Sequence, residues 1–303
     1  MDTGKRYRLL DCGLGRRLES FGALLVDRPA PTADRVRRAP GLWVDAIAYR
    51  AGRGWATPDG VRPEPGMVDV ALGGVVMVMR LAPGGQVGIF PEHAANASWL
   101  RTAIAARVET SPGQEPEVLN LFAHSGLLSL VAASAGARVT HVDASRPAVQ
   151  AARLNAEHSG LAGHPIRWIV DDALDFVRRE GRRGRRYGGL IADPPSYGHG
   201  ARGARAETRG GWQFETGIDG LLAACRAIAE PDAFWILSTH TPGWPADRLA
   251  ATLEHRAGAR AGGLPGAAGA HAESIELAME AESGASLHLG VAARLDPRRG
   301  ESE

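Results

Sequence analysis

The sequence is poor in cysteine, has no long apolar run and carries almost no net charge. Two cysteines, Cys12 and Cys225, are too few for a disulfide framework, and no cysteine pair has the spacing of a zinc site. No stretch approaches the roughly 20 apolar residues that a membrane-spanning helix requires, and the N-terminal MDTGKRYRLL lacks the apolar centre of a signal peptide. These absences predict a cytoplasmic protein without a membrane partner.

Charge is nearly balanced over the whole chain but not along it. The 35 Lys+Arg, among which Lys5 is the only lysine, face 34 Asp+Glu, so the formal net charge is +1. Residues 1–108 hold 15 basic and 10 acidic side chains, a balance of +5, whereas residues 109–303 have a balance of −4. Near-neutrality disfavours a protein that binds nucleic acid mainly through a basic surface. If RNA binds, we expect residues 1–108 to hold it.

The hydrophobic pattern changes along the chain and predicts two domains. The first part reads as short strands and turns; Met67–Leu72 and Val75–Leu81, for example, flank a Gly-Gly pair and predict a hairpin. From Pro116 onward, apolar strand runs alternate with helical stretches, which is typical of a parallel α/β sheet. We expect a Rossmann-like doubly wound, mostly parallel sheet with a C-terminal antiparallel hairpin, in residues 85–303. A small β-rich N-terminal domain should occupy residues 1–84.

Individual elements follow from the same pattern. The expected strands of the α/β part are Glu117–Leu121, Arg138–Asp143, Ile166–Val170, Gly189–Asp193 and Phe234–Ser238, with a closing hairpin of Ser274–Met279 and Ser286–Leu295. The expected helices are Pro91–Val108, Leu127–Ser134, Ser145–Ser159, Ala173–Arg179 and Ile218–Ala229.

The turn after the first strand of the α/β part, NLFAHSG at residues 120–126, is the first candidate binding site. In a doubly wound sheet this turn lies at the carboxyl ends of the strands, where a nucleotide-like ligand approaches the backbone. Gly126 has no side chain at the tightest point, and the amides that open the next helix offer donors to a carboxylate or phosphate.

Acidic residues follow the next two strands. Asp143 ends the second strand, as expected of an acid that binds ribose hydroxyls. Asp172, in the sequence VDDA, comes just after the third strand. Aspartates at strand ends also cap helices, but their joint placement with the glycine turn favours a cofactor site.

A third motif, DPPSYG at residues 193–198, follows the fourth strand. Its two prolines stiffen the turn and set the direction of the chain that carries Asp193 and Tyr197. A rigid strand end with polar and aromatic side chains is what a transferase needs to hold an acceptor against a donor.

Together these motifs resemble class I S-adenosylmethionine (SAM)-dependent methyltransferases. The stretch from Asn120 to Gly200 is similar in particular to a branch of rRNA methyltransferase-like proteins with motifs near NLFAYTG, VTHVDAS, RWIVDDAL and DPPSFG. The segment GIFPEHAAN at residues 88–96 resembles that group's extra segment before the sheet, which packs over bound SAM. The resemblance is best over residues 85–245.

The resemblance implies SAM as the cofactor. Gly126 and its neighbours would face the methionine part, Asp143 the ribose, and Asp172 the adenine, while residues 193–197 would line the sulfonium and the acceptor pocket. The implied cofactor-binding residues are Phe90, Asn120, Phe122, His124, Ser125, Gly126, Asp143, Ala144, Asp172, Ala173, Asp193 and Pro194.

The sequence departs from this family pattern in the turn, at the fifth strand, and in the Arg/Gly-rich segment 201–211, where the family usually has a shorter loop. Leu127 replaces the second glycine of the turn, and His124 replaces its aromatic residue. The related rRNA cytosine methyltransferases use a nucleophilic cysteine near the fifth strand, but residues 238–241 read STHT here. Covalent attack on cytosine is therefore disfavoured.

The candidates for orienting or deprotonating an acceptor are Asp193, Tyr197 and His240. Three histidines, His124, His199 and His240, lie at strand ends, and the sequence leaves open which of them acts. The ten histidines show no metal-binding spacing, so no metal site is predicted.

These features predict a SAM-dependent transferase that moves a methyl group to an N, O or C nucleophile of a small molecule or RNA. One alternative is a SAM-consuming cyclase or lyase that releases methylthioadenosine, with ring closure to azetidine-2-carboxylate; the altered turn motivates it. A second is a non-catalytic SAM- or RNA-binding module. The charge balance favours a small-molecule acceptor, or SAM itself, over RNA, and a homodimer stays open.

Overall fold

The computed structural model describes residues 5–64, 66–111, 113–198, 211–257 and 271–298. His199, one of the three strand-end histidines, lies outside these residues.

A seven-stranded sheet forms the centre of the α/β part, in the order β10-β9-β8-β11-β14-β16-β15. The five strands from β10 to β14 are parallel, and β16 runs antiparallel to both of its neighbours. The expected Rossmann-like sheet with a C-terminal antiparallel hairpin is therefore confirmed. The strands are β8 (Glu117–Leu121), β9 (Arg138–Asp143), β10 (Ile166–Val170), β11 (Tyr187–Ala192), β14 (Ala229–Thr239), β15 (Glu273–Glu280) and β16 (Ser286–Leu295).

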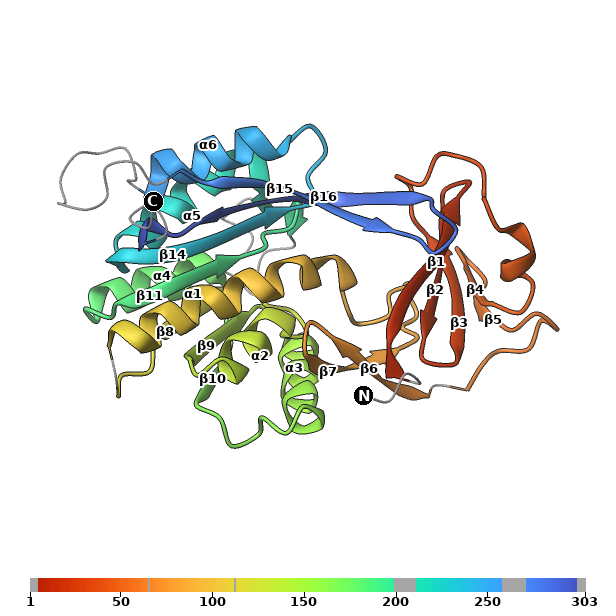
Figure 1. Ribbon diagram of the computed structural model, residues 1–303, viewed down its shortest axis with the longest axis horizontal. Coiled ribbons are helices and arrows are strands. Elements are labelled where there is room, and N and C mark those ends of the chain that lie inside the picture. The colour runs from red at the N-terminus through yellow and green to blue at the C-terminus, as the bar shows by residue number, and fades with distance from the viewer. Residues whose placement is uncertain (1–4, 65, 112, 199–210, 258–270, 299–303) are drawn as a thin grey trace.

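Helices cover both faces of this sheet (Figure 1). Along β8, Val118 packs in the core with α1 and α2, whereas the next residue, Leu119, packs in the core with α4, α5 and α6. Apolar side chains on both faces of a strand are what a sheet buried on two sides requires. The helices are α1 (Ala97–Thr110), α2 (Leu127–Ser134), α3 (Arg146–His158), α4 (Ala173–Arg182), α5 (Phe214–Arg226) and α6 (Ala246–Ala257).

The helix expected at Pro91–Val108 is divided in two. Pro91–Asn96 forms the 3-10 helix η3, and α1 begins only at Ala97. The side chains of Glu92 and His93 in η3 are buried, so this turn presents them to the interior. None of the helices in the described ranges is long and apolar enough to cross a membrane.

A second sheet of five strands lies at the N-terminal end, in the order β1-β2-β3-β4-β5. Its strands are β1 (Tyr7–Gly13), β2 (Arg16–Phe21), β3 (Leu24–Pro29), β4 (Ile47–Arg50) and β5 (Gly54–Ala56); a short 3-10 helix, η2 (Pro40–Trp43), precedes β4. This arrangement confirms the small β-rich N-terminal region.

The expected hairpin at the Gly-Gly pair forms β6 (Met67–Leu72) and β7 (Val75–Arg80). This hairpin packs on the helices of the α/β part: the amide of Val78 donates to Asn155 Oδ1 at 2.8 Å, and that of Val76 donates to Ser159 Oγ at 3.0 Å. A domain boundary between residues 84 and 85 stays a prediction.

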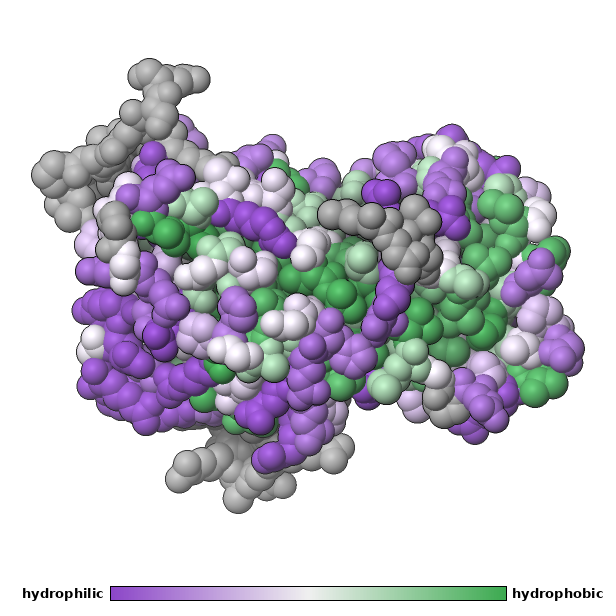
Figure 2. Space-filling model, turned by 60° about the horizontal axis from the view of Figure 1, so that its bottom comes forward, coloured by the Kyte–Doolittle hydropathy of each residue, from purple (hydrophilic) through white to green (hydrophobic). Residues whose placement is uncertain are grey.

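The hairpin of β15 and β16 reaches from the main sheet to the N-terminal sheet (Figure 1). At its tip the amides of Glu282 and Ser283 donate to the carbonyls of Leu9 and Leu10, each at 3.0 Å. The buried carboxylate of Asp11 also accepts from Ser283 Oγ at 2.7 Å. Figure 2 shows apolar residues across the middle of the molecule and into its right-hand end, whereas the left-hand end is more polar.

Candidate functional site

The turn between β8 and α2 has an unusual backbone. Phe122 and His124 have φ angles of 54° and 45°, and Gly126 has 88°. A positive φ is strained for residues with a side chain and concentrates at functional sites. A Cβ on Gly126 would lie 3.0 Å from the Cβ of Ala152, so α3 approaches the turn too closely for a side chain there. The glycine is therefore required by the close packing of α3 on this turn, which lies at the carboxyl end of β8.

A buried polar network lies beneath this turn. Asn120 Nδ2 donates to Ser129 Oγ at 2.9 Å, and Ser129 Oγ lies 3.0 Å from Nδ1 of the buried His141. The side chain of Asn155 donates to the carbonyl of Ser125 at 2.8 Å. Burial, together with the charge of His124, lowers the pKa of His141 to about 3. Asn120 thus supports the turn from inside.

Asp143 lies at the end of β9 beside the turn. Its Oδ2 accepts from the amide of His124 at 2.9 Å, and its Oδ1 accepts from the amide of Ser145 at 2.8 Å. The carboxylate is half-buried and retains free lone pairs, which suits the pair of hydroxyls on a ribose. The neighbouring Ala144 is exposed.

Asp172 precedes α4 and caps it: the amide of Asp175 donates to its Oδ1 at 3.0 Å. The capping role that the sequence left open is therefore present, and Ala173 is buried in the first turn of the helix. Asp172 follows β10, so its Oδ2 and the adjacent backbone lie at the same edge of the sheet as Asp143.

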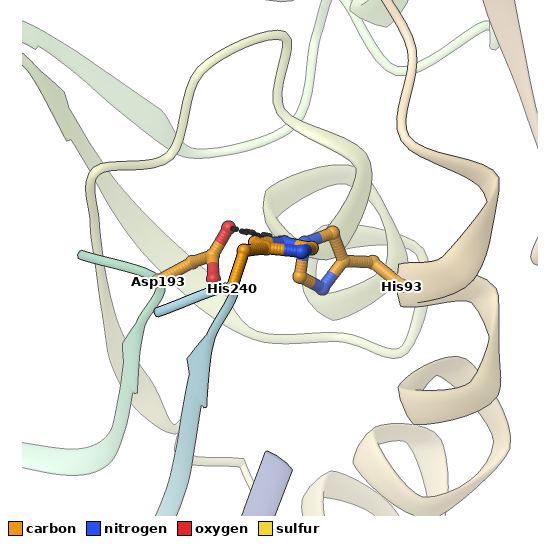
Figure 3. Close-up of side chains that lie close together, drawn as sticks. All are labelled: His93, Asp193 and His240. Carbon is orange, nitrogen blue, oxygen red and sulfur yellow. Dashed lines mark ion pairs between the residues drawn. The ribbon is translucent and has the colours of Figure 1, made fainter. Parts of the chain in front are cut away.

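Asp193, at the end of β11, is the centre of a tight polar group (Figure 3). Its Oδ2 lies 3.0 Å from Nε2 of His93 and 3.9 Å from Nε2 of His240. Its Oδ1 accepts from Ser238 Oγ at 2.7 Å. His240 is held in turn, because its Nδ1 lies 2.6 Å from the carbonyl oxygen of Leu289.

The charges in this group are coupled. Burial opposes the charged form of Asp193, but His93, together with Ser238 and His240, holds the pKa of Asp193 well below its usual range. Burial likewise opposes protonation of His93, but the carboxylate of Asp193 outweighs it and raises the pKa of His93 to about 9. At neutral pH this region therefore holds a carboxylate beside an imidazolium.

The remaining candidate residues differ in their position. The ring of Phe90 lies 4.9 Å from that of His124 and 6.4 Å from that of His93, so it links the turn to the Asp193 group. Pro194 is buried, but Tyr197 is 78% exposed. The structure thus brings together two of the three catalytic candidates, Asp193 and His240, and leaves Tyr197 at the surface.

Sequence reasoning did not select His93. His93 lies in the segment at residues 88–96, which resembles the family's extra segment, but only Phe90 of this segment is among the predicted cofactor-binding residues. His93 is far from Asp193 and His240 along the chain, so no spacing rule connects them. Their contact results from the folding of η3 against the ends of β11 and β14.

The turn, Asp143 and the Asp193 group together fit SAM. Gly126 directly precedes α2, and the amides that open this helix suit a carboxylate. Asp143 keeps carboxylate lone pairs that suit a pair of hydroxyls, and the ring of Phe90 lies beside the turn, where an aromatic face suits a cation such as a sulfonium.

Comparison with known proteins supports this interpretation. Residues 98–203 match the family described as Conserved hypothetical protein 95. The structure of a SAM-dependent methyltransferase from Agrobacterium tumefaciens is 31% identical, with a TM-score of 0.82 over 98% of this chain and 92% of that one. A structure from Streptococcus mutans, 15% identical with a TM-score of 0.68 over 97% of this chain and 76% of its own, shares the fold.

Curated relatives are named ribosomal RNA large subunit methyltransferase I. The protein from Photobacterium profundum is 28% identical over 155 residues, which cover 50% of this chain and 37% of the relative. That from Pseudoalteromonas translucida is 32% identical over 85 residues, or 28% of this chain and 22% of the relative. The chain thus spans about a third or less of the length of these relatives.

These relatives correct one expectation from the sequence. The charge balance favoured a small-molecule acceptor, or SAM itself, over RNA, and the names of the relatives contradict that ranking. Net charge gave the wrong ranking of acceptors because it is summed over the whole chain, whereas binding to a polyanion depends on the local surface charge.

Proposed function

The chain belongs to the class I SAM-dependent methyltransferases, and from this premise we propose that it transfers a methyl group to a nucleotide of ribosomal RNA. SAM, the cofactor of this family, supplies an electrophilic methyl group on a sulfonium. The similarity to the curated rRNA methyltransferases carries the proposal, because the family match at residues 98–203 includes the turn, Asp143 and the Asp193 motif.

Each part of the site has a separate task in this proposal. The Gly126 turn and the amides that open α2 hold the methionine part, Asp143 holds the ribose, and Asp172 with Ala173 faces the adenine. Asp193 and His240 face the acceptor and orient its nucleophilic atom. The rigid Pro-Pro turn after Asp193 keeps this geometry when the acceptor enters.

The cysteines of the chain favour direct transfer over a covalent enzyme–base intermediate. Cys225 is fully buried in α5, and burial raises its pKa to about 12. Cys12 is buried in the N-terminal sheet. At the end of β14, Ser238 donates its hydroxyl hydrogen bond to Asp193. A thiolate nucleophile is therefore absent from the described part of the site.

The surface of the N-terminal sheet supplies positive charge for RNA. Arg35, Arg53 and Arg62 are exposed on its loops, and Arg37 stacks on the ring of Trp43 with its guanidinium carbon 3.7 Å from the ring centroid. Guanidinium groups bind phosphate in bidentate fashion and stack on bases. We assign the RNA backbone to this surface, in keeping with the +5 balance of residues 1–108.

Methyl transfer is tested with SAM labelled in its methyl group and with ribosomal RNA from cells whose copy of the gene has been deleted. We expect label in RNA and an equal amount of S-adenosylhomocysteine. Nucleoside mass spectrometry then identifies the modified base. S-adenosylhomocysteine without labelled RNA contradicts an RNA acceptor, and methylthioadenosine from SAM alone contradicts methyl transfer.

Two variants separate the chemistry from the fold. Asp193→Asn should lose transfer while it retains calorimetric SAM binding, because Asp193 faces the acceptor side of the site. Asp247→Asn, at an exposed position in α6, makes the same chemical change away from the site and should retain full activity.

RNA binding has its own test in the salt dependence of affinity. Arg35→Ala and Arg53→Ala should each reduce the slope of log affinity against log salt by about 0.7 to 0.9, the value for one lost phosphate contact. Arg178→Ala, at an exposed position in α4, is the matched control and should leave the slope unchanged. Equal slopes for all four proteins contradict this RNA surface.

A further inference from the structure

We propose that His93, Asp193 and His240 form a binding site for one divalent transition-metal ion of the zinc type. The three side chains come from η3, the end of β11 and the end of β14, and point toward one another (Figure 3). Each offers one ligand atom, and these atoms all lie within 4.8 Å of one another. Within the described ranges no other three histidine, cysteine or acidic side chains come this close.

The separations of the ligand atoms fit a bound ion. Zinc binds imidazole nitrogen and carboxylate oxygen at about 2.0 to 2.2 Å, so two tetrahedrally placed ligands lie about 3.4 Å apart. The two separations from Asp193 Oδ2, 3.0 Å to His93 and 3.9 Å to His240, lie on either side of this value. The third separation, between the two imidazoles, is at most 4.8 Å, so the two rings would turn toward each other when an ion binds. Two histidines and one carboxylate also match the ligand set of catalytic zinc sites.

Ring nitrogens of the two histidines lack hydrogen-bond partners among the described residues. Nε2 of His240 is buried and makes no hydrogen bond to any described residue, and neither ring nitrogen of His93 makes a hydrogen bond of good geometry. His93 Nε2 and Asp193 Oδ2 are close enough to form an ion pair but are not aligned as donor and acceptor. His93 itself is only 7% exposed. An ion pair of His93 and Asp193 gives Nε2 of His240 no partner. A metal ion would bind this nitrogen together with His93 and Asp193 Oδ2.

Contacts around the group hold the ligands in a metal-binding orientation. His240 Nδ1 donates to the carbonyl of Leu289 at 2.6 Å, so Nε2 carries the lone pair. Ser238 donates to Asp193 Oδ1 and leaves Oδ2 for the ion. Gly290 permits this arrangement, because a Cβ there would lie 2.6 Å from the carbonyl of Thr239 and 2.9 Å from Nδ1 of His240. Such outer contacts are typical of metal ligands.

One side of the group is partly exposed, although the ligand nitrogens themselves are buried. The side chains of His240 and Asp193 are 33% and 27% exposed, whereas His93 closes the inner side at 8%. Three protein ligands and an open fourth position are typical of catalytic sites, where the ion binds an oxygen or nitrogen of the substrate. The ion would hold the acceptor atom opposite the sulfonium and favour its deprotonated form. This site does not require that the acceptor be RNA.

The test uses tag-free, full-length protein that has been treated with a chelator. Titration with cobalt chloride should produce the visible d–d absorption of low-coordinate Co²⁺, saturating at one ion per chain, and zinc chloride should displace it. His93→Ala and His240→Gln should each weaken binding at least about a hundredfold. Ser238→Ala should weaken it by about tenfold, as expected for an outer contact.

His158 provides the matched control. Its Nδ1 lies 2.7 Å from Asp69 Oδ1, which reproduces a histidine–carboxylate pair without a third ligand, so His158→Ala should bind cobalt like the parent. Because His93 is buried, circular dichroism must first show that His93→Ala folds. If it does not fold, His240→Gln, at a partly exposed position, serves as the test variant. The proposal is overturned if the parent binds no cobalt at one per chain, or if His240→Gln binds it unchanged.

Discussion

The stability of the protein in acid should depend on His141. This side chain is fully buried beneath the cofactor turn, where its ring lies 4.9 Å from that of Trp168. Burial, aided by the charge of His124, lowers its pKa from the ordinary 6.5 to about 3. Above pH 6.5 His141 is neutral in both the folded and the unfolded chain, so it adds no pH dependence there. As the pH falls below 6.5, only the unfolded chain takes up the proton, and stability falls.

The size of this effect follows from the two pKa values. Each pH unit between them lowers the free energy of unfolding by about 1.36 kcal/mol, which amounts to about 2.7 kcal/mol at about pH 4.5. The substitution His141→Phe retains a ring against Trp168 but cannot titrate. It also removes the hydrogen bond to Ser129, at a cost of about 1 kcal/mol at every pH. The difference between parent and variant should therefore shift by about 2.7 kcal/mol between about pH 7.5 and 4.5.

Urea unfolding followed by tryptophan fluorescence measures this difference at each pH. Because both proteins share every other titratable group, the comparison isolates His141 together with its coupling to His124. His288→Gln, at an exposed position, is the control and should follow the parent at every pH. A stability difference between parent and His141→Phe that stays constant over this range would refute the reasoning.

Three further substitutions test how the site is supported. Gly126→Ala should raise the calorimetric Kd for SAM about tenfold or more, because a left-handed backbone costs a side chain roughly 1 to 2 kcal/mol and the new Cβ would meet Ala152; an unchanged Kd contradicts this. Asn155→Ala leaves the buried amide of Val78 and the buried carbonyl of Ser125 without partners. The free energy of unfolding should fall by about 1 to 3 kcal/mol for each group, and the affinity for SAM should fall with it. Asp11→Ala should lower the melting temperature while the Kd for SAM stays within about twofold. The reason is that Asp11 bonds to Trp43 and to the β15–β16 tip, far from the turn. Loss of SAM binding with an unchanged melting temperature would count against this prediction.

The hydrophobic pattern predicted the α/β sheet well. Strands β8, β9 and β10 and helix α2 begin and end at the predicted residues. β8 and β9 are buried along most of their length, as central strands of a sheet covered on both faces are. The same pattern missed α6 (Ala246–Ala257) and the short strands β4 and β5. The buried face of α6 includes the charged Glu254 beside alanine and leucine, and β4 and β5 have only four and three residues. Their structure depends on packing against neighbours.

The sequence could also identify the candidate cofactor residues, for a related reason. In a parallel sheet every strand ends at the same edge, so Asp143, Asp172 and Asp193 could be placed near the glycine turn from their positions after successive strands. Spacing along the chain could not show which way a side chain points. Asn120 is turned inward to Ser129, and Tyr197 is turned outward to solvent.

Local order in the sequence thus determined the type of fold, the edge of the sheet that carries the site and the resemblance to a family that uses SAM. Only the tertiary structure decided that His93 meets Asp193 and His240, and that the β15–β16 tip binds the N-terminal sheet at Asp11. The physical reason is the same in both cases. These contacts join segments that are distant in sequence, and their geometry is set by how η3 and a long hairpin pack, which no local periodicity encodes.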